Sequence, residues 1–413
     1  MKEWTTYKLK DICIKITDGS HFSPTAREDG YPMFSVKDME EYGFNYASCK
    51  RISLEDFNTL KANDCVPQKG DILVAKDGSF LKQIFVCNET KEAAILSSIA
   101  IFRPNPEYVL PEFLCYILKS PKVYNYISQN CVSGSALPRI VLKAFKEVEV
   151  SIPSIAIQKW IISKLIPIDQ KIQLNRQIND NLEQQAKALY KSWFVDFEPF
   201  KEGKFIESEL GVIPEGWSIG KIEDLTTRMA SGGTPKSMNP DFYSGDICWF
   251  TTKELTDGFL IDSEKHISQS AIENSAAKVF PKGSVLMAIY AAPTVGRLGI
   301  LSCDAAFNQA AVALIPKTGI GPGYIYLTLY NERNNFNNLS SGAAQQNLNV
   351  GLVRNYPTCI PPQDVLADFE NKILPIFNNI ERNQIEISTL TTLRDTLLPK
   401  LMSGELKINE IDC

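Results

Sequence analysis

Cysteine and histidine, which often supply nucleophiles and metal ligands, are present but are not spaced for either chemistry. The ten cysteines include no CxxC pair, and the closest two are 16 residues apart. This spacing argues against structural zinc and thioredoxin-like chemistry. His21 and His266 are the only histidines, too few for a histidine-based metal site or a catalytic triad. We therefore expect no metal site and no catalytic residue, and we interpret the cysteines as small apolar side chains in a reducing compartment.

Motifs for binding phosphates and cofactors are absent as well. The sequence has no GxxxxGK[ST], GxGxxG, HExxH or GxSxG motif. It also lacks the Asn-Pro-Pro-aromatic box with which amino-methyltransferases hold a flipped adenine, because its one Pro-Pro pair, Pro361-Pro362, is followed by Gln363. In a chain of 413 residues, this favours a binding or scaffold role over catalysis.

Two short segments combine residue types that are suited to recognition. One reads Ile16-Thr-Asp-Gly-Ser-His21 and the other Ser231-Gly-Gly-Thr-Pro235. Glycine beside small polar side chains allows close backbone approach, and the polar groups can form hydrogen bonds. The alternative interpretation is that Gly19, Gly232, Gly233 and Pro235 are turn residues whose polar neighbours merely cap the turn.

The two segments belong to a tandem repeat. Trp4 and Trp217 each open a run with the same rhythm of apolar and polar residues, 213 residues apart. The pair Ile152-Pro153 recurs 208 residues later as Ile360-Pro361. The chain is therefore two copies of one unit of roughly 200 residues.

Each copy begins with a strand-rich region and ends with a helical one. Short β-branched and aromatic runs, separated by Gly, Pro and Asn, come first. An apolar 4-3 spacing follows in each copy and lasts for more than four heptads, which predicts a coiled coil. The seam positions are Ile161, Leu165, Ile168, Ile172, Asn175, Asn179, Leu182, Ala186, Leu189 and Trp193 in the first copy, and Leu366, Phe369, Ile373, Ile376, Ile380, Asn383, Ile387, Leu390, Arg394, Leu397 and Leu401 in the second.

The sequence predicts an α+β protein with two β-rich domains, separated by two long helices that form an antiparallel coiled coil with pseudo-two-fold symmetry. Asn175, Asn179 and Asn383 lie inside the seams, where polar residues fix register. Pro167 and Pro375 should kink each helix or divide it into a short and a long one. The alternative is that each helix is buried independently on its own domain. The expected boundaries are 1–155 for the first domain, 156–197 for its helix, 198–216 for a linker, 217–362 for the second domain, 363–403 for its helix and 404–413 for a tail.

Composition and charge limit the class of protein. With 44% apolar and 22% charged residues, the chain is not collagen-like, of low complexity or wholly disordered. No apolar stretch is long enough for a membrane span, and no signal peptide is visible, so we expect a cytoplasmic protein without a membrane partner. The net charge of −5 lacks the basic footprint that phosphate contacts usually leave, so a DNA-binding role would require partners that supply positive charge.

The whole chain resembles the specificity subunits of type I restriction-modification systems. The resemblance lies in the order of the short segments and of the helix that follows each copy. The resemblance rests on the Ile-Pro pair before each heptad helix and on four segments of the second copy, which are Gly211–Trp217, Ser231–Pro235, Ile247–Phe250 and Phe307–Gln309. It also rests on Ile16–His21 with Pro24, the first-copy counterpart of Ser231–Pro235 and Ile247–Phe250. The first copy departs from it, with Ile95-Leu-Ser-Ser98 in place of Phe307-Asn-Gln309. Two domains that read different half-sites would need such variation.

The resemblance implies that each domain reads half of a split double-stranded DNA site and that the helices bind two adenine-N6 methyltransferase subunits, with room for two restriction subunits. S-adenosylmethionine, ATP and Mg would lie on those partners, and this chain would hold no cofactor. Side chains near the glycine segments that could contact phosphates or base edges are Thr17, Asp18, Ser20, His21, Lys37, Lys76, Ser79, Lys82, Arg139, Ser231, Thr234, Lys236, Lys253, Tyr290, Thr294, Arg297, Gln345, Gln346 and Asn347. The alternatives are a single-chain DNA methyltransferase or nuclease with degenerate motifs, and a two-domain protein-binding scaffold.

Overall fold

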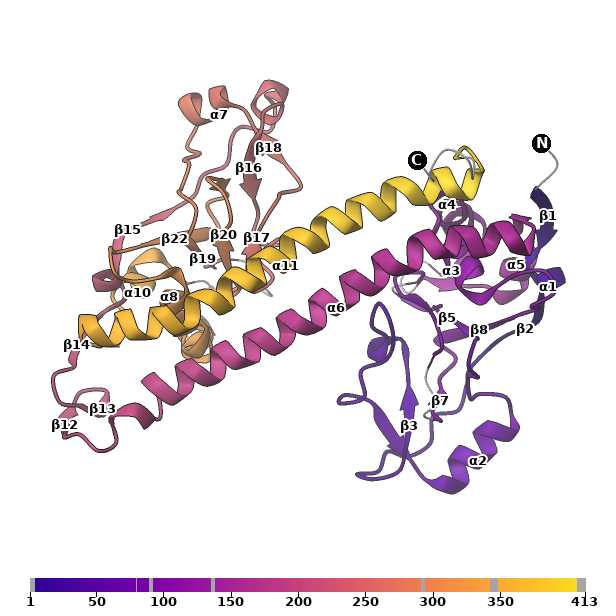
Figure 1. Ribbon diagram of the computed structural model, residues 1–413, viewed down its shortest axis with the longest axis horizontal. Coiled ribbons are helices and arrows are strands. Elements are labelled where there is room, and N and C mark those ends of the chain that lie inside the picture. Colours follow the sequence, from indigo (N-terminus) through magenta and orange to yellow (C-terminus); the bar gives the residue numbers. More distant parts are fainter. Residues whose placement is uncertain are drawn as a thin grey trace. The chain divides into compact units, whose positions relative to one another are not determined.

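The computed structural model describes residues 4–78, 80–88, 92–134, 138–290, 294–341 and 348–406, which form two compact units (Figure 1). Unit 1 comprises Met1–Gln173 and Leu390–Cys413, and unit 2 comprises Leu174–Thr389. Two long helices, α6 (Ile155–Phe194) and α11 (Gln363–Ser403), each contribute residues to both units. Among the described residues, no helix is long and apolar enough to cross a membrane.

Unit 1 is built around a four-stranded sheet in the order β2-β8-β5-β6 and a three-stranded sheet in the order β4-β3-β7. Two further strand pairs, β1 with β11 and β9 with β10, are antiparallel. The strands are β1 (Trp4–Lys8), β2 (Cys13–Asp18), β3 (Tyr31–Phe34), β4 (Lys50–Ile52), β5 (Ile72–Ala75), β6 (Ile84–Val86), β7 (Ala94–Ile95), β8 (Ile99–Pro104), β9 (Val132–Ser133), β10 (Arg139–Ile140) and β11 (Glu149–Pro153). The shorter helices are α1 (Leu9–Ile12), η1 (Val36–Asp38), α2 (Leu54–Ala62), α3 (Pro111–Lys119), α4 (Pro121–Asn130) and α5 (Leu142–Lys146).

Strand β5 lies between two hydrophobic cores because both of its faces are apolar. Ile72 and Val74 belong to a core that also contains α3 and the ends of α6 and α11 within this unit. Leu73 and Ala75 belong to a core on the other side. Successive side chains of a strand point to opposite faces, so a continuous Ile-Leu-Val-Ala run fits a strand covered on both sides.

Unit 2 repeats this plan with a five-stranded sheet in the order β15-β22-β19-β20-β17 and a three-stranded sheet in the order β18-β16-β21. Strand β14 pairs with β23, and β12 pairs with β13. The strands are β12 (Phe205–Ser208), β13 (Gly211–Pro214), β14 (Ser218–Lys221), β15 (Thr226–Ser231), β16 (Ile247–Phe250), β17 (Gly258–Leu260), β18 (His266–Ile267), β19 (Val285–Ala288), β20 (Leu298–Leu301), β21 (Ala306–Phe307), β22 (Ala311–Pro316) and β23 (Pro357–Ile360). The shorter helices are η2 (Glu198–Phe200), η3 (Ile222–Leu225), η4 (Pro240–Tyr243), α7 (Gln269–Asn274), α8 (Pro322–Asn331), α9 (Arg333–Ser341) and α10 (Val350–Arg354).

Strand pairing confirms the tandem repeat. In unit 1, Ile72 of β5 pairs with Phe102 of β8, and in unit 2 Val285 of β19 pairs with Leu314 of β22. Both copies share a parallel pair between short strands, β3 with β7 in the first and β16 with β21 in the second, and the second copy adds the parallel pair β17 with β20. The sequence between 198 and 216, expected to be a linker, contains η2 and the β12–β13 hairpin.

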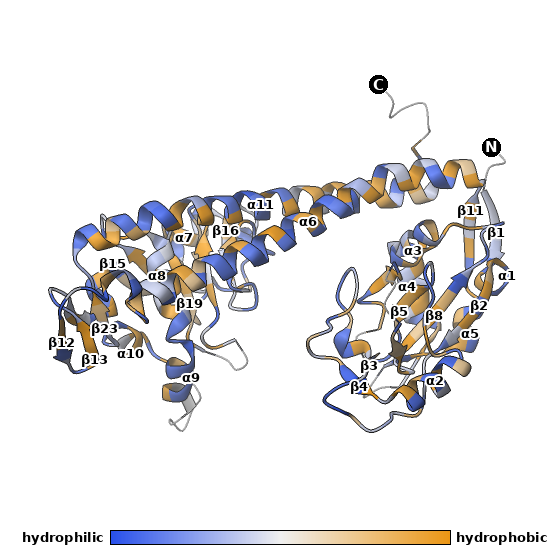
Figure 2. Cartoon of the chain, turned by 60° about the horizontal axis from the view of Figure 1, so that its bottom comes forward, coloured by the Kyte–Doolittle hydropathy of each residue, from blue (hydrophilic) through white to orange (hydrophobic). Residues whose placement is uncertain are grey.

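The two long helices follow the heptad pattern. Figure 2 shows hydrophobic and hydrophilic residues alternating along both. Within unit 2, Asn175 of α6 bonds to Glu386 of α11, and Asn179 bonds to Asn383. The partner's number falls as the number on α6 rises, so the helices are antiparallel there. The predicted α+β architecture with a coiled coil of two long helices is thus confirmed.

The two prolines do not divide the helices. Pro167 lies inside α6, and Pro375 lies within the bounds of α11, which is also continuous. Of the two alternatives, division into a short and a long helix is therefore wrong for both copies, and a kink at either proline stays a prediction. Proline removes one hydrogen bond and crowds the preceding turn at a cost of about 3 kcal/mol. Leu165 and Ile172, on either side of Pro167, are fully buried, and this packing holds the flanking turns in helical geometry.

Candidate nucleic-acid interface

The two glycine segments occupy the same place in the two copies. Gly19 is the residue after β2, and it lies so close to β7 that an added Cβ would be 2.2 Å from the Ile95 carbonyl oxygen. Gly232 follows β15, and its Cβ would lie 2.1 Å from the Phe307 carbonyl oxygen of β21. Neither glycine has a positive φ. Both are therefore needed for close approach of the chain to its own backbone, and not for a left-handed turn.

Backbone hydrogen bonds extend this equivalence to a second segment. The Lys76 N–H donates to the Ser98 carbonyl, and the Ile140 N–H donates to the Lys76 carbonyl. In the second copy, the Ile289 N–H donates to the Ala310 carbonyl, and the Leu348 N–H donates to the Ile289 carbonyl. Lys76 and Ile289 therefore occupy equivalent positions on one backbone frame, which carries different side chains in the two domains.

In the first domain the frame carries a group of charged residues, here called the ionic cluster, made of Asp18, His21, Lys76, Asp77 and Arg139. Lys76 Nζ lies 2.7 Å from Asp18 Oδ2 and 3.8 Å from Asp77 Oδ1. Arg139 Nε lies 3.0 Å from Asp77 Oδ1, and His21 Nε2 lies 3.6 Å from Asp18 Oδ1. The Lys76 side chain is only 5% exposed, whereas those of His21 and Arg139 are 73% and 53% exposed. Lys76 thus holds the two carboxylates in place, and His21 and Arg139 are the members open to a ligand.

The other candidates of the first domain differ in accessibility. Ser20 is buried, and its hydroxyl donates to the Phe22 carbonyl over 2.7 Å. Thr17 is half-buried on β2, and its hydroxyl lies 3.4 Å from the Asp18 carbonyl. Lys37 is exposed on η1, and the exposed Lys82 lines a cleft beside the long helices of unit 1. Ser79 lies outside the described residues.

In the second domain, neutral contacts fix the segment Ser231–Lys236, here called the second-domain loop. The Trp249 indole N–H donates to the Gly233 carbonyl over 2.9 Å, and the Tyr243 hydroxyl donates to the Pro235 carbonyl over 2.8 Å. The Thr234 hydroxyl bonds to the side-chain amide oxygen of Gln309. Ser231 is half-buried at the end of β15, while Thr234 and Lys236 are exposed. Backbone anchors therefore present the Thr234 and Lys236 side chains from a fixed loop.

The remaining second-domain candidates are spread over several elements. Tyr290, which follows the residue equivalent to Lys76, is 38% exposed, and Lys253 is exposed. Thr294 is buried, with its hydroxyl 3.2 Å from the Tyr290 carbonyl, and Arg297 is half-buried. Gln345, Gln346 and Asn347 lie outside the described residues.

Sequence reasoning missed three residues that shape these sites. Asp77 pairs with Arg139 in the first domain, while Gln309 and Trp249 hold the second-domain loop. Gln309 and Trp249 did stand in the strings on which the resemblance rests, so the signal was present but was not assigned to individual side chains. Asp77 carried no signal beyond its place next to Lys76.

The two sites differ in chemistry although they share a frame. The ionic cluster offers a guanidinium and an imidazole beside carboxylates. Arg pairs with guanine in the major groove, and carboxylates accept from the cytosine amino group. The second-domain loop offers a hydroxyl, an ammonium group and, nearby, the Tyr290 phenol. Two different sets of hydrogen-bonding groups can discriminate two different sequences.

Comparison with known proteins identifies the family. The type I restriction modification DNA specificity domain matches residues 1–184 and 214–395, which include both copies. The chain is 26% identical to the type I restriction enzyme HindI specificity subunit of Haemophilus influenzae, covering 98% of this chain and 100% of that one. It is 27% identical to the MjaIX specificity subunit of Methanocaldococcus jannaschii, covering 99% and 95%. A crystal structure of a type I S subunit from M. genitalium shares the fold, with a TM-score of 0.58 at 16% identity over 96% of each chain. The chain therefore belongs to the type I restriction modification DNA specificity family.

Proposed function

We propose that the two β-rich domains divide sequence recognition between them, each reading one half of a bipartite double-stranded DNA site. As a member of the specificity family, the chain determines which DNA sequence is recognised and is not itself a catalyst. One observation supports the proposal that the two domains read different half-sites. The same backbone frame presents the ionic cluster in the first domain and neutral contacts in the second. Copies that read the same half-site would have no need of different groups there.

In the first domain, His21 and Arg139 are the proposed contacts with DNA. Arg139 forms an ion pair with Asp77, with Nε 3.0 Å from Oδ1, which holds the guanidinium near this site and leaves its N–H groups for bases or phosphates. In the second domain, Thr234 and Lys236 are the proposed contacts with DNA. A good base contact contributes about 1–3 kcal/mol of discrimination.

We further propose that the long helices bind two adenine-N6 methyltransferase subunits and that two restriction subunits can join the complex. S-adenosylmethionine, ATP and Mg then belong to those partners. Exposed leucine and isoleucine side chains on the helices support docking, since Leu174 and Ile178 lie one turn apart on α6, and Leu374 and Ile385 are exposed on α11. The net charge of −5 agrees with a complex in which the partners supply much of the positive charge.

A mobility-shift assay tests this function. The chain is purified alone and with the methyltransferase subunit from the same cells, and each sample is titrated with genomic DNA fragments at fixed salt. We expect sequence-dependent retention with the complex and much weaker retention with the chain alone. Strong methyl transfer or cleavage by the chain alone would favour the single-chain enzyme. Absence of specific retention in either sample would favour the protein-binding scaffold.

Native mass spectrometry tests the docking surface separately. We expect two methyltransferase subunits per chain and fewer with a Leu174→Asp, Ile178→Asp variant, because two carboxylates in an apolar contact are costly. Leu54→Asp, at an exposed apolar residue of α2, is the matched control and should keep both subunits. A strict one-to-one complex of the unaltered chain would contradict the proposed stoichiometry.

A further inference from the structure

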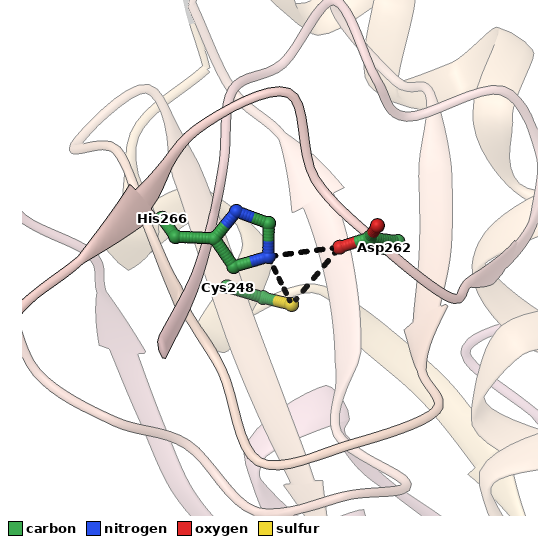
Figure 3. A group of neighbouring side chains, drawn as sticks. All are labelled: Cys248, Asp262 and His266. Atoms are coloured by element: carbon green, nitrogen blue, oxygen red, sulfur yellow. Dashed lines mark hydrogen bonds and ion pairs between the residues drawn. The ribbon is translucent and has the colours of Figure 1, made fainter. Parts of the chain in front are cut away.

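Three donor atoms of different chemistry meet on the second domain, in residues that the family resemblance leaves without a role. Cys248 of β16 pairs directly with His266 of β18 across the antiparallel ladder, and Asp262 lies in the connection just before β18 (Figure 3). His266 Nε2 lies 2.9 Å from Asp262 Oδ1 and 3.6 Å from Cys248 Sγ. Cys248 Sγ lies 3.6 Å from Asp262 Oδ1. The sulfur, nitrogen and oxygen atoms thus form a small triangle.

The arrangement does not fit a cysteine protease-like triad. Such a triad needs one imidazole nitrogen toward the nucleophile and the other toward the carboxylate. Here the same nitrogen, Nε2, faces both Cys248 and Asp262. Burial also raises the pKa of the Cys248 thiol to about 11, which opposes formation of a nucleophilic thiolate at neutral pH in the absence of a cation.

The triangle has the dimensions of a metal centre. Zn–S distances of about 2.3 Å and Zn–N and Zn–O distances of about 2.0–2.1 Å in a tetrahedron place sulfur about 3.6 Å from either light atom and nitrogen about 3.4 Å from oxygen. Both separations that involve Cys248 Sγ already match. The imidazole and carboxylate need to move apart by only about 0.5 Å.

We propose that Cys248, Asp262 and His266 bind one zinc ion, with water in the fourth position. A thiolate, an imidazole and a carboxylate are the three ligand types that zinc takes in proteins. Asp262 and His266 are 66% and 35% exposed, so an ion can enter from solvent. Cys303 lies beside Cys248 and interacts with its thiol, but it is outside the triangle of donors.

The proposed ion would act on the recognition surface. Cys248 is followed in β16 by Trp249, whose indole holds the Gly233 carbonyl of the second-domain loop. The backbone N–H of Trp249 donates to the hydroxyl oxygen of Ser263, the residue after Asp262, over 3.0 Å. Zinc would therefore clamp β16 and β18 behind the loop, so it would stabilise the second domain without touching DNA.

Cobalt titration of the full chain tests the site. After chelation and dialysis, Co²⁺ is added and the thiolate-to-cobalt absorption is recorded. We expect one Co²⁺ per chain, displaced by Zn²⁺, and a Tm that rises with Zn²⁺ because the ion binds only the folded site. Cys248→Ser and His266→Gln should abolish the absorption, and Asp262→Asn should weaken Co²⁺ binding at least tenfold, with the metal-free Tm within a few degrees of the unaltered chain.

Matched controls exclude adventitious binding by other thiols and imidazoles. Cys49→Ser and His21→Asn alter a half-buried cysteine and the other histidine, both in the first domain, and should leave the titration unchanged. Cys303→Ser should also retain the absorption. The proposal is overturned if the unaltered chain shows no thiolate-to-cobalt absorption, if the Cys248 and His266 variants keep it, or if the Cys303 variant loses it.

Discussion

The Asn383 side-chain amide donates a hydrogen bond of 2.8 Å to the Asn179 side-chain oxygen in the buried seam between α6 and α11. Asn179 in turn donates to the Ile380 carbonyl over 3.3 Å. Both asparagines are nearly inaccessible to solvent. A polar pair in an otherwise apolar seam is satisfied in one register, because sliding either helix would leave the amides buried without partners.

Removing one member of this pair should cost more than removing both. Asn383→Leu should lower the free energy of unfolding by about 1–3 kcal/mol, because the buried Asn179 oxygen loses its donor. The double variant Asn179→Leu, Asn383→Leu should recover most of that loss. Urea denaturation of the four proteins of the double-mutant cycle measures the coupling. Additive losses would show that the two amides do not act as a pair.

A second buried polar group stabilises unit 1. Asp169 of α6 accepts from Arg394 over 3.0 Å and from the Tyr116 hydroxyl over 2.6 Å, and its side chain is 13% exposed. Asp169→Leu should destabilise the protein by about 2–3 kcal/mol, since it leaves a largely buried guanidinium short of a partner. Lys201→Met, which breaks an exposed ion pair with Glu198, is the control and should change stability by no more than about 0.5 kcal/mol. Equal effects in denaturant melts would refute this ranking.

Glu370 of α11 makes stability depend on pH. Burial raises the pKa of its carboxyl group, and one carboxyl oxygen is buried without a hydrogen-bond partner. Because the folded-state pKa lies above the unfolded value, the stability due to protonation is full at low pH and is lost as the pH rises through the folded-state pKa. Glu370→Gln should therefore raise Tm at pH 7, with the gain shrinking toward pH 4.

The matched control for this prediction is Asp368→Asn, an exposed position on the same helix. It should change Tm little at either pH. A Glu370→Gln variant that is less stable than the unaltered chain at pH 7, or equally stabilised at both pH values, would contradict the sign of the effect.

Local patterns in the sequence were sufficient to predict the helices and the repeat. The heptad spacing identified the buried seam, including Asn179 and Asn383, because helical periodicity follows from residues three and four apart. The sequence could not decide whether Pro167 divides α6, because a local rule cannot include the packing of Leu165 and Ile172 on either side of it. Tertiary packing outweighs the lost hydrogen bond there.

The sites were predictable only in part, since their members come together through strand pairing. Asp18 and Lys76 are 58 residues apart and meet through neighbours in one sheet. Cys248 and His266 face each other across a ladder whose register no short motif encodes. The glycine segments could be matched between copies because the close approach of Gly19 and Gly232 to a backbone carbonyl restricts the residue type. Which side chains that frame brings together depends on long-range contacts.

The central claim, one domain for each half-site, is tested most directly by mapping methylated adenines across the genome of cells whose chain carries an exchanged second-domain loop. The segment Ser231–Lys236 is replaced by that of a homologous specificity subunit, with a chain altered at His21 and Arg139 as the reciprocal variant. We expect each variant to change or relax only one half of the methylated motif, and not the same half, because each lost base contact costs about 1–3 kcal/mol at its own position. A motif that changes in both halves with either variant, or in neither half while methylation continues, would contradict the assignment.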